Sequence, residues 1–425
     1  MGSQGKLDSG SRYLPSGGSP QGGQSPSDPE RALLTPGVSQ RWKTTDSIRR
    51  FQPSWRVREC GRWAAWGHTE VDIVKTENGF AFGHLHHCGS VWSCPACAHT
   101  ICLGRATEVS DAVGWWRSRQ SGNDLVMMSL TVRHRAGNDL LTLRKGMSAA
   151  WRRLQQTRTW RGFRAACGVA HLIRCHEVTH GEHGWHPHLH VLLMCTRPDM
   201  VQGWASTLVD VWRTEVPYVM GSAHRPSREH AAVISPCHDS SYIARMGLEL
   251  GSPSSKAAAE GHNTAMQLAQ ALADTRSQEV RDRLAALWRE YSIAMRGCHQ
   301  LQWSRGLRDA MGAPPADVQV ASAEVDVQSR EPIAHIPRET WREMAVKRGV
   351  HALDSLGVKC KDLGPVHCRD ALVQFFQSLE NVPAYMRPDN RLRWIVDAGR
   401  EEEPDPGAAE SAIDRLRRAW TSQNP

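Results

Sequence analysis

Polar and apolar residues alternate along two neighbouring segments of the chain. "HLIRCHEVT" at 171–179 and "GWHPHLHVLLM" at 184–194 both show a period of two. This period is typical of β-strands, whose successive side chains point to opposite faces. A glycine-containing loop, "HGEHGW", lies between them, so we expect 171–179 and 186–194 to pair as an antiparallel hairpin.

Other segments predict further strands and helices. "DLVMMSLTVRH" at 124–134 is apolar and contains β-branched residues, as a buried strand does. Apolar residues recur at helical spacing over 138–157, and helical patterns also cover 198–214, 239–250 and 257–296. Helices and strands are therefore mixed along the chain.

Composition divides the 425 residues into five parts. Residues 1–40 are poor in large apolar side chains and predict a disordered tail, whereas 58–105 is rich in cysteine. Residues 106–311 carry the hairpin and most of the helical patterns. Residues 312–332 have the composition of a linker, and 333–425 indicates a helical C-terminal region of unknown role.

Three histidines at alternate positions of the second strand suggest a metal site. His186, His188 and His190 would share one face, and Leu189, Val191 and Leu193 the other. In the predicted hairpin Glu177 can reach the histidine face. With His188 and His190 it would form a site of two histidines and one carboxylate, with positions left open for substrate oxygens. His186, at the mouth of the strand, is a fourth ligand or a phosphate contact. We expect this face to be exposed.

The cysteine-rich segment suggests a second metal site. Cys94 and Cys97 form a C-x₂-C pair, Cys88 lies shortly before it, and Cys60 is the fourth candidate. Four thiolates around Zn²⁺ would fold a small glycine-rich segment that lacks its own core. The alternatives are a redox pair or free thiols. Several other side chains compete as ligands: His84, His86, His87, His99 and Cys102.

The chain carries a net charge of +8, and its positive charge is concentrated in one stretch. No acidic residue occurs from Leu140 to His176. Four arginines in this stretch are predicted phosphate contacts: Arg152, Arg153, Arg158 and Arg161. Trp151 and Trp160 lie among them, and basic groups with interleaved aromatics suit DNA with unstacked bases. A solvated helix face is the alternative.

No run of apolar residues is long enough to span a membrane, and the N-terminus lacks the pattern of a signal peptide. These features predict a cytoplasmic protein without a membrane partner. Reduced cysteines are expected in that compartment, which favours metal ligands and buried thiols over disulfides.

A candidate nucleophile follows the histidine strand. Tyr242 lies near the start of the predicted helix in "HDSSYIARMGLEL", with Arg245 one turn further on. A phenol that attacks a phosphodiester would leave a phosphotyrosine and free a sugar hydroxyl, while a metal polarises the phosphate. Packing of a half-buried tyrosine is the alternative.

Taken together, these motifs resemble the rolling-circle replication initiators of plasmids and phages, within the His-hydrophobe-His (HUH) endonuclease superfamily. The matching stretches are "MSLTVRH", "HEVTHGEHGWHPHLHVLL" and "SYIARMGLEL", and the resemblance covers roughly residues 58–312. "CGSVWSCPACA" and "GCHQLQWSRGLRDAMG" are similar to flanking segments of the actinobacterial members.

The resemblance implies an α+β fold in which helices flank a central antiparallel sheet, and an enzyme that nicks one DNA strand. His188 and His190 match the histidine pair, Glu177 the carboxylate that completes the site, and Tyr242 the nucleophile. Mg²⁺ or Mn²⁺ is the implied catalytic ion. The implied partners are single-stranded or hairpin origin DNA, and a host helicase and polymerase.

One position departs from the family pattern. Some relatives have a glutamate one helical turn before the tyrosine, where it activates water to end the cycle. Here His238 occupies that position, with Asp239 beside it. These two residues are candidates for that role.

Two classes of alternative function remain open. A single-strand transposase or a conjugative relaxase would use the same chemistry, although relaxases usually place the histidines after the tyrosine. A non-catalytic, zinc-dependent DNA-binding regulator of replication would keep the cysteines and the basic stretch. Such a regulator would have no need of Tyr242 and Glu177.

Overall fold

The predicted hairpin is present in the computed structural model of the protein and exceeds its predicted length. Strand β4 (Val169–Gly181) pairs antiparallel with β5 (Gly184–Cys195). Gly184 closes the turn with φ +82°, and a Cβ at this position would lie 3.2 Å from the backbone of Ala136. Both the left-handed backbone and the close approach therefore require glycine here.

The structure describes residues 38–76, 79–237, 263–313, 332–346, 353, 356–357, 359–360 and 362–378. The predicted helix at 239–250 and residues 1–37 of the predicted tail lie outside these ranges, as do residues 314–331 of the predicted linker. Among the described helices, none combines the length and the apolar character needed to cross a membrane.

The hairpin forms the centre of an antiparallel sheet. Strand β3 (Asp124–Thr131) pairs with β5, as the apolar segment at 124–134 leads one to expect, and β6 (Ala232–Pro236) pairs with β3. On the other side, β4 pairs with the short strands β7 (Asn263–Thr264) and β8 (Leu301–Trp303). The main strand order is β6-β3-β5-β4-β7, so β5 lies in the interior of the sheet.

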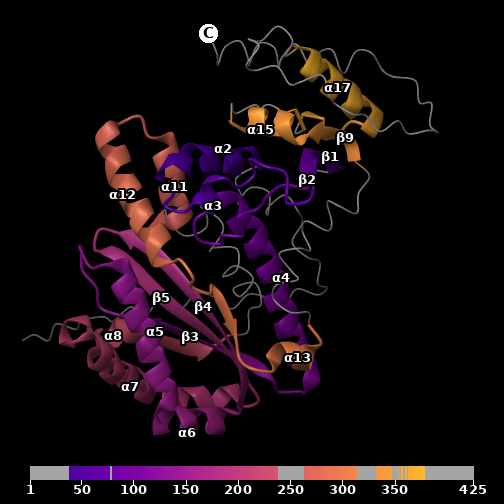
Figure 1. Ribbon diagram of the computed structural model, residues 1–425. Helices are drawn as coiled ribbons and strands as arrows, with labels where there is room; N and C mark the ends of the chain where they lie inside the picture. Colours follow the sequence, from indigo (N-terminus) through magenta and orange to yellow (C-terminus); the bar gives the residue numbers. More distant parts are fainter. Residues whose placement is uncertain are drawn as a thin grey trace, which may run out of the picture.

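Three helices pack on one face of this sheet: α5 (Leu140–Gln156), α6 (Arg158–Cys167) and α7 (Gln202–Met220) (Figure 1). The sheet contributes alternate apolar residues of β3 and β5 to this core: Val126, Met128, Leu130, Leu189, Val191 and Leu193. Burial of these side chains is the main force that holds the helices on the sheet.

The long helix α4 (Pro95–Arg119) packs on the other face. Its residues Val109, Val113 and Trp116 contact a second core, to which the same strands contribute their other set of side chains: Leu125, Met127, Leu192 and Met194. The fold is thus a mixture of helices and antiparallel sheet, with helices on both faces.

The helical pattern at 257–296 forms two helices, α11 (Ala265–Asp274) and α12 (Gln278–Ala294). They are separate because the hydroxyls of Thr264 and Ser277 each accept a hydrogen bond at a helix N-terminus, which starts a new helix. Shorter helices and turns complete this part of the fold: α2 (Val38–Ile48), η1 (Arg49–Phe51), α3 (Trp55–Arg58), η2 (Pro198–Val201), η3 (Ser222–His224), α8 (Arg228–Ala231) and α13 (Leu307–Met311).

A second, small sheet joins distant parts of the chain. Strand β1 (Glu70–Thr76) lies between β2 (Gly79–Gly83) and β9 (Pro332–Pro337). Helices α15 (Arg338–Val346) and α17 (Pro365–Ser378) follow β9. This unit has its own apolar core, which includes Val71, Ile73, Ile336, Trp341 and Leu372. The C-terminal region therefore begins with a strand that completes a sheet of the cysteine-rich segment.

Candidate functional site

The predicted row of imidazoles is present on β5. The ring centroids of His186 and His188 lie 4.2 Å apart, and those of His188 and His190 lie 5.7 Å apart with their planes at 6°. The apolar residues of the opposite face are fully buried against the helices: Leu189, Val191 and Leu193. The alternation of β5 therefore produces the two faces that the sequence predicts.

His190 lies at the centre of a polar cluster built from three adjacent strands. Its Nε2 is 2.7 Å from Oε2 of Glu177 on β4, and its Nδ1 is 2.8 Å from Oγ of Ser129 on β3. The expectation of an exposed face is wrong for His190, which is only 6% exposed because these neighbours enclose its ring. Ser129 could not be predicted from the sequence pattern, since only the β3–β5 register places it opposite His190.

The His190–Glu177 pair fits one edge of a divalent metal site. Adjacent ligands at about 2.1 Å from an octahedral Mg²⁺ ion lie about 3 Å apart, close to the observed N–O distance. The Ser129 hydroxyl holds the ring so that Nε2 is directed at the carboxylate, as a supporting residue in a metal site does. His188 lies opposite Glu177 in the register, but these side chains do not gather within 4.8 Å as a set of three.

His186 has a different environment from the other two histidines. Its ring centroid lies 4.5 Å from that of His134, in the segment that follows β3. The Nδ1 of His134 is 3.1 Å from the carbonyl oxygen of His183 in the turn. His186 thus belongs to a pair of histidines at the mouth of the strand. Its two predicted roles are a fourth metal ligand and a phosphate contact.

Four predicted catalytic residues lie outside the described residues: His238, Asp239, Tyr242 and Arg245. The described chain leaves the sheet at Cys237, whose amide donates to the carbonyl of Leu125 at 2.9 Å. It returns at Asn263, which pairs with His180 on β4. The segment that contains Tyr242 therefore connects two strands of the sheet that carries the histidine row.

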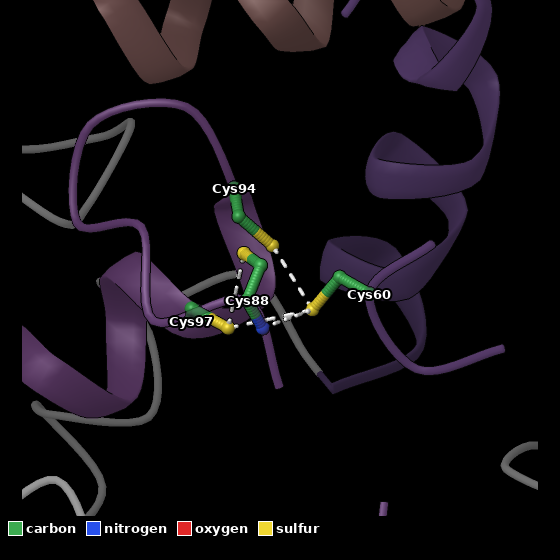
Figure 2. Close-up of side chains that lie close together, drawn as sticks. All are labelled: Cys60, Cys88, Cys94 and Cys97. Carbon is green, nitrogen blue, oxygen red and sulfur yellow. Dashed lines mark hydrogen bonds between the residues drawn. The ribbon is translucent and has the colours of Figure 1, made fainter. Parts of the chain in front are cut away.

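The four predicted cysteine ligands form a compact buried cluster. Cys60 Sγ lies 3.4 Å from Cys97 Sγ and 3.6 Å from Cys94 Sγ, and Cys88 Sγ lies 3.7 Å from Cys97 Sγ (Figure 2). Four sulfurs at about 2.3 Å from a tetrahedral zinc ion lie about 3.8 Å apart. All four cysteines are free thiols rather than disulfides. The cluster could therefore hold a metal such as zinc.

Backbone groups around the cluster favour thiolates. The amide of Cys88 donates to Cys60 Sγ, and the amide of Ser90 donates to Cys88 Sγ, each at 3.4 Å. Cys94 caps the N-terminus of α4 and Cys97 lies in its first turn, where the helix dipole stabilises negative charge. Hydrogen bonds from the neighbouring thiols lower the pKa of Cys60 well below its usual value, whereas the contact with Cys60 raises the pKa of Cys94 and of Cys97, so Cys60 ionises first.

The competing ligands remain outside the cluster. His87 comes nearest, with its Nδ1 3.9 Å from Cys97 Sγ. His99 is not part of the cluster, and burial lowers the pKa of its imidazole to about 4. Cys102 instead contacts the side-chain amide of Gln300, and burial raises the pKa of its thiol to about 11.

We expect purified protein to contain about one zinc ion per chain. Cys94→Ser should lose this ion and make residues around the cluster sensitive to protease, because zinc binding contributes directly to the folding of such segments. Elemental analysis and limited proteolysis measure both effects. Cys298→Ser, at a half-buried cysteine outside the cluster, is the control and should retain the zinc. Fully folded, active protein without zinc would contradict the prediction.

The basic stretch combines exposed arginines with a buried aromatic core. Arg152, Arg158 and Arg161 are exposed. Arg153 instead pairs with Glu215 at 2.6 Å and lies 3.6 Å from the ring centroid of Tyr218. The sequence pattern predicts that the rings of Trp151 and Trp160 are accessible to unstacked bases, and this prediction is wrong. Both are 2% exposed, since they face the core of α5 and α6.

Comparison with known proteins gives three findings. Residues 84–200 match the family described as "Replication protein". "Protein rep" of Streptomyces lividans is 26% identical over 301 residues, which cover 55% of this chain and 66% of the relative. A "Neomycin resistance protein" of Streptomyces cyanogenus is 30% identical over 150 residues, which cover 29% of this chain and 34% of the relative. The chain thus spans slightly less than two thirds of the first relative and about a third of the second. No solved structure matches.

The family match and the geometry of the site coincide in one part of the chain. The matched segment 84–200 contains three of the four clustered cysteines, as well as Glu177, Ser129 and the histidine row. It ends before Tyr242. Residues 84–200, with the site that they contain, are thus similar to the family of replication (Rep) proteins.

Proposed function

We propose that the protein initiates rolling-circle replication by nicking one strand of DNA at an origin. The observation that carries the proposal is the contact between His190 and Glu177, supported by Ser129, on three adjacent strands within the family match. A buried imidazole and carboxylate at this distance, on rigid strands, are suited to hold a divalent ion beside a phosphate.

The proposed reaction is an exchange of one phosphodiester for another. The Tyr242 oxygen attacks the phosphorus, a bond forms between them, and the bond to the 3′ oxygen breaks. The phenol proton is lost and the departing oxygen gains a proton, so the products are a 5′-phosphotyrosine and a free 3′ hydroxyl. Because the phosphodiester is conserved, the joint can later be resealed. A host polymerase would extend the hydroxyl, and a host helicase would open the duplex.

His190, His188 and Glu177 would hold the catalytic ion, with His186 as a further ligand or phosphate contact. Mg²⁺ or Mn²⁺, when bound, would polarise the phosphate and stabilise the charge that develops on its oxygens. Imidazole ligands suit softer ions better than they suit Mg²⁺, so a site with one carboxylate favours Mn²⁺ at least equally.

Two further residues have proposed roles near the tyrosine. A phenol has an ordinary pKa of about 10, so Tyr242 requires activation, and the cation of Arg245 would stabilise its phenolate. His238 and Asp239 stand where a water-activating residue is expected, and either would serve to end the cycle. An HUH-like arrangement, with the histidine strand inside an antiparallel sheet, is part of the same proposal.

A covalent adduct tests the proposal directly. We expect the protein, incubated with Mn²⁺ and a labelled single strand of its origin, to form a protein–DNA adduct that survives denaturing electrophoresis. Mass spectrometry of the digested adduct should locate the nucleotide on Tyr242. Simple hydrolysis of the strand without an adduct would overturn the tyrosine mechanism. A nucleotide on Tyr218 or Tyr291 would overturn the assignment of the residue.

A further inference from the structure

Three adjacent cavities lie along the edge of the main sheet; the first two adjoin α5, and the third lies between the loop at 88–93, α4 and the end of α12. The largest has a volume of about 760 Å³, and the other two have volumes of about 460 Å³ each. The largest shares Arg152, Arg174 and Gln302 with the second cavity, and shares the segment 297–299 with the third. Because neighbouring cavities share these lining residues, we describe them as one groove. It runs from the loop at 88–93, past β8, to α5 and α6.

The lining of this groove is strongly basic. Six of its arginines define it here as the basic groove: Arg56, Arg105, Arg144, Arg152, Arg174 and Arg305. Among the described residues, no aspartate or glutamate lines any of the three cavities. Elsewhere in the described chain, several arginines pair with carboxylates, as Arg308 does with Glu108 at 2.8 Å. The basic groove therefore concentrates positive charge that its lining does not neutralise.

The arginines in the middle of the groove have neutral partners or incomplete hydrogen bonding. Arg174 donates to the side-chain oxygen of Gln302. The Nε of Arg144 is buried and has no hydrogen-bond partner among the described residues. Burial lowers the pKa of Arg174, and the nearby charge of Arg152 lowers it further. Partly buried cations without anionic partners carry a free-energy cost, which a bound anion would offset.

The basic groove is separate from the candidate active site. Arg174 lies on β4 between Ile173 and Cys175, whose side chains belong to the core beneath α4. Because side chains alternate along a strand, Arg174 points to the α5 side, whereas Glu177 and the histidine row face the α4 side. A ligand at Arg174, in the part of the groove beside α5, would therefore lie across the sheet from His190.

The shape of the groove favours a single strand over a duplex. A linear series of cationic cavities can follow a chain of phosphates, as the channels of proteins that bind single strands do. A duplex is wider and stiffer than a single strand, so we expect it to reach fewer of the arginines inside these cavities.

We propose that the basic groove binds the phosphate backbone of a single DNA strand, and that its central part, around Arg152 and Arg174, does so on the face of the sheet opposite the histidine row. The choice of DNA among polyanions rests on the proposed function, whereas the groove itself rests on its own residues. Bound in this way, a strand would stay on the protein independently of the reaction at Tyr242.

Binding of a labelled, mixed-sequence single strand without an origin tests the proposal. The full chain carries Tyr242→Phe and receives no divalent ion, so that no cutting occurs. We expect Arg152→Gln with Arg174→Gln to lower the affinity at least about tenfold. The slope of log K against log salt should fall by about 0.7 for each phosphate that the protein no longer neutralises. Arg283→Gln with Arg289→Gln, at exposed positions on α12, removes the same charge outside the groove and should change neither value.

Two further measurements keep the result interpretable. Arg152→Gln alone alters an exposed side chain, so a reduced slope in this variant cannot be attributed to misfolding. The same strand annealed to its complement should bind with little dependence on these arginines. Wild-type affinity and salt slope in the double variant would overturn the proposal. An equal loss of affinity for the duplex and for the single strand would also overturn it. Because no step requires cleavage, failure of the adduct experiment would leave this result unchanged.

Discussion

Tyr242→Phe should bind the origin strand as the wild type does and form no covalent adduct. The substitution removes only the attacking oxygen and keeps the aromatic ring, so the fold and the DNA contacts should persist. A nucleophile and the groups that activate it act as a unit, so loss of the nucleophile removes most of the rate enhancement that they provide together. We therefore expect the rate of adduct formation to fall at least about a thousandfold. Denaturing electrophoresis of the labelled strand measures the adduct, and fluorescence anisotropy measures the binding.

Two other tyrosines serve as controls for this experiment. Tyr291 is 4% exposed, and burial raises the pKa of its phenol, so it is a poor nucleophile. Tyr218 on α7 is 73% exposed but lies against the guanidinium of Arg153 on α5. Tyr218→Phe and Tyr291→Phe should both form the adduct at close to the wild-type rate. An undiminished adduct in Tyr242→Phe would contradict the proposed mechanism.

His190→Ala should slow cleavage by about a hundredfold or more while DNA binding stays within about twofold, because the ion that His190 would hold stabilises charge in the transition state. His230→Ala, at an exposed histidine of α8, removes an imidazole away from the row and should have no effect. Single-turnover cleavage across a Mn²⁺ titration measures both variants. Full activity of a folded His188→Ala/His190→Ala variant, without added divalent metal, would contradict this metal site.

Ser129 provides a finer test of the same geometry. It contacts His190 Nδ1 at 2.8 Å and would act as a positioning residue rather than as a ligand. Loss of such a support typically costs about 10–100-fold in metal affinity. Ser129→Ala should therefore require correspondingly more Mn²⁺ and recover the wild-type rate at saturation. A lower rate that added Mn²⁺ does not restore would show that Ser129 has another role.

Much of the local structure follows from sequence patterns. The period of two in 171–179 and 186–194 predicts the hairpin and the two faces of β5, because strand geometry alone alternates the side chains. The C-x₂-C pair at Cys94 and Cys97 identifies the cysteine site, since this spacing brings two thiols to one helix N-terminus. Both features depend on residues close together in the sequence.

The surroundings of those residues could not be predicted in the same way. Trp151 and Trp160 interrupt a basic stretch in the sequence, yet α5 and α6 turn both rings into the core. Arg153 has the same sequence context as Arg152, but only Arg153 meets Glu215. Which side of a helix is covered depends on the elements packed against it, and these come from distant parts of the chain.

The sequence by itself determined the strands β3, β4 and β5, the alternation of the histidines and the types of ligand at both candidate metal sites. Glu177 and Cys60 are predicted from the sequence, but only the tertiary structure placed Ser129 beside His190 and brought Cys60 Sγ to 3.4 Å from Cys97 Sγ. It also decided that β9 pairs with β1, and that the basic groove forms between α5 and β8. The physical reason is that local patterns follow from backbone geometry, whereas register and burial follow from the packing of the whole chain.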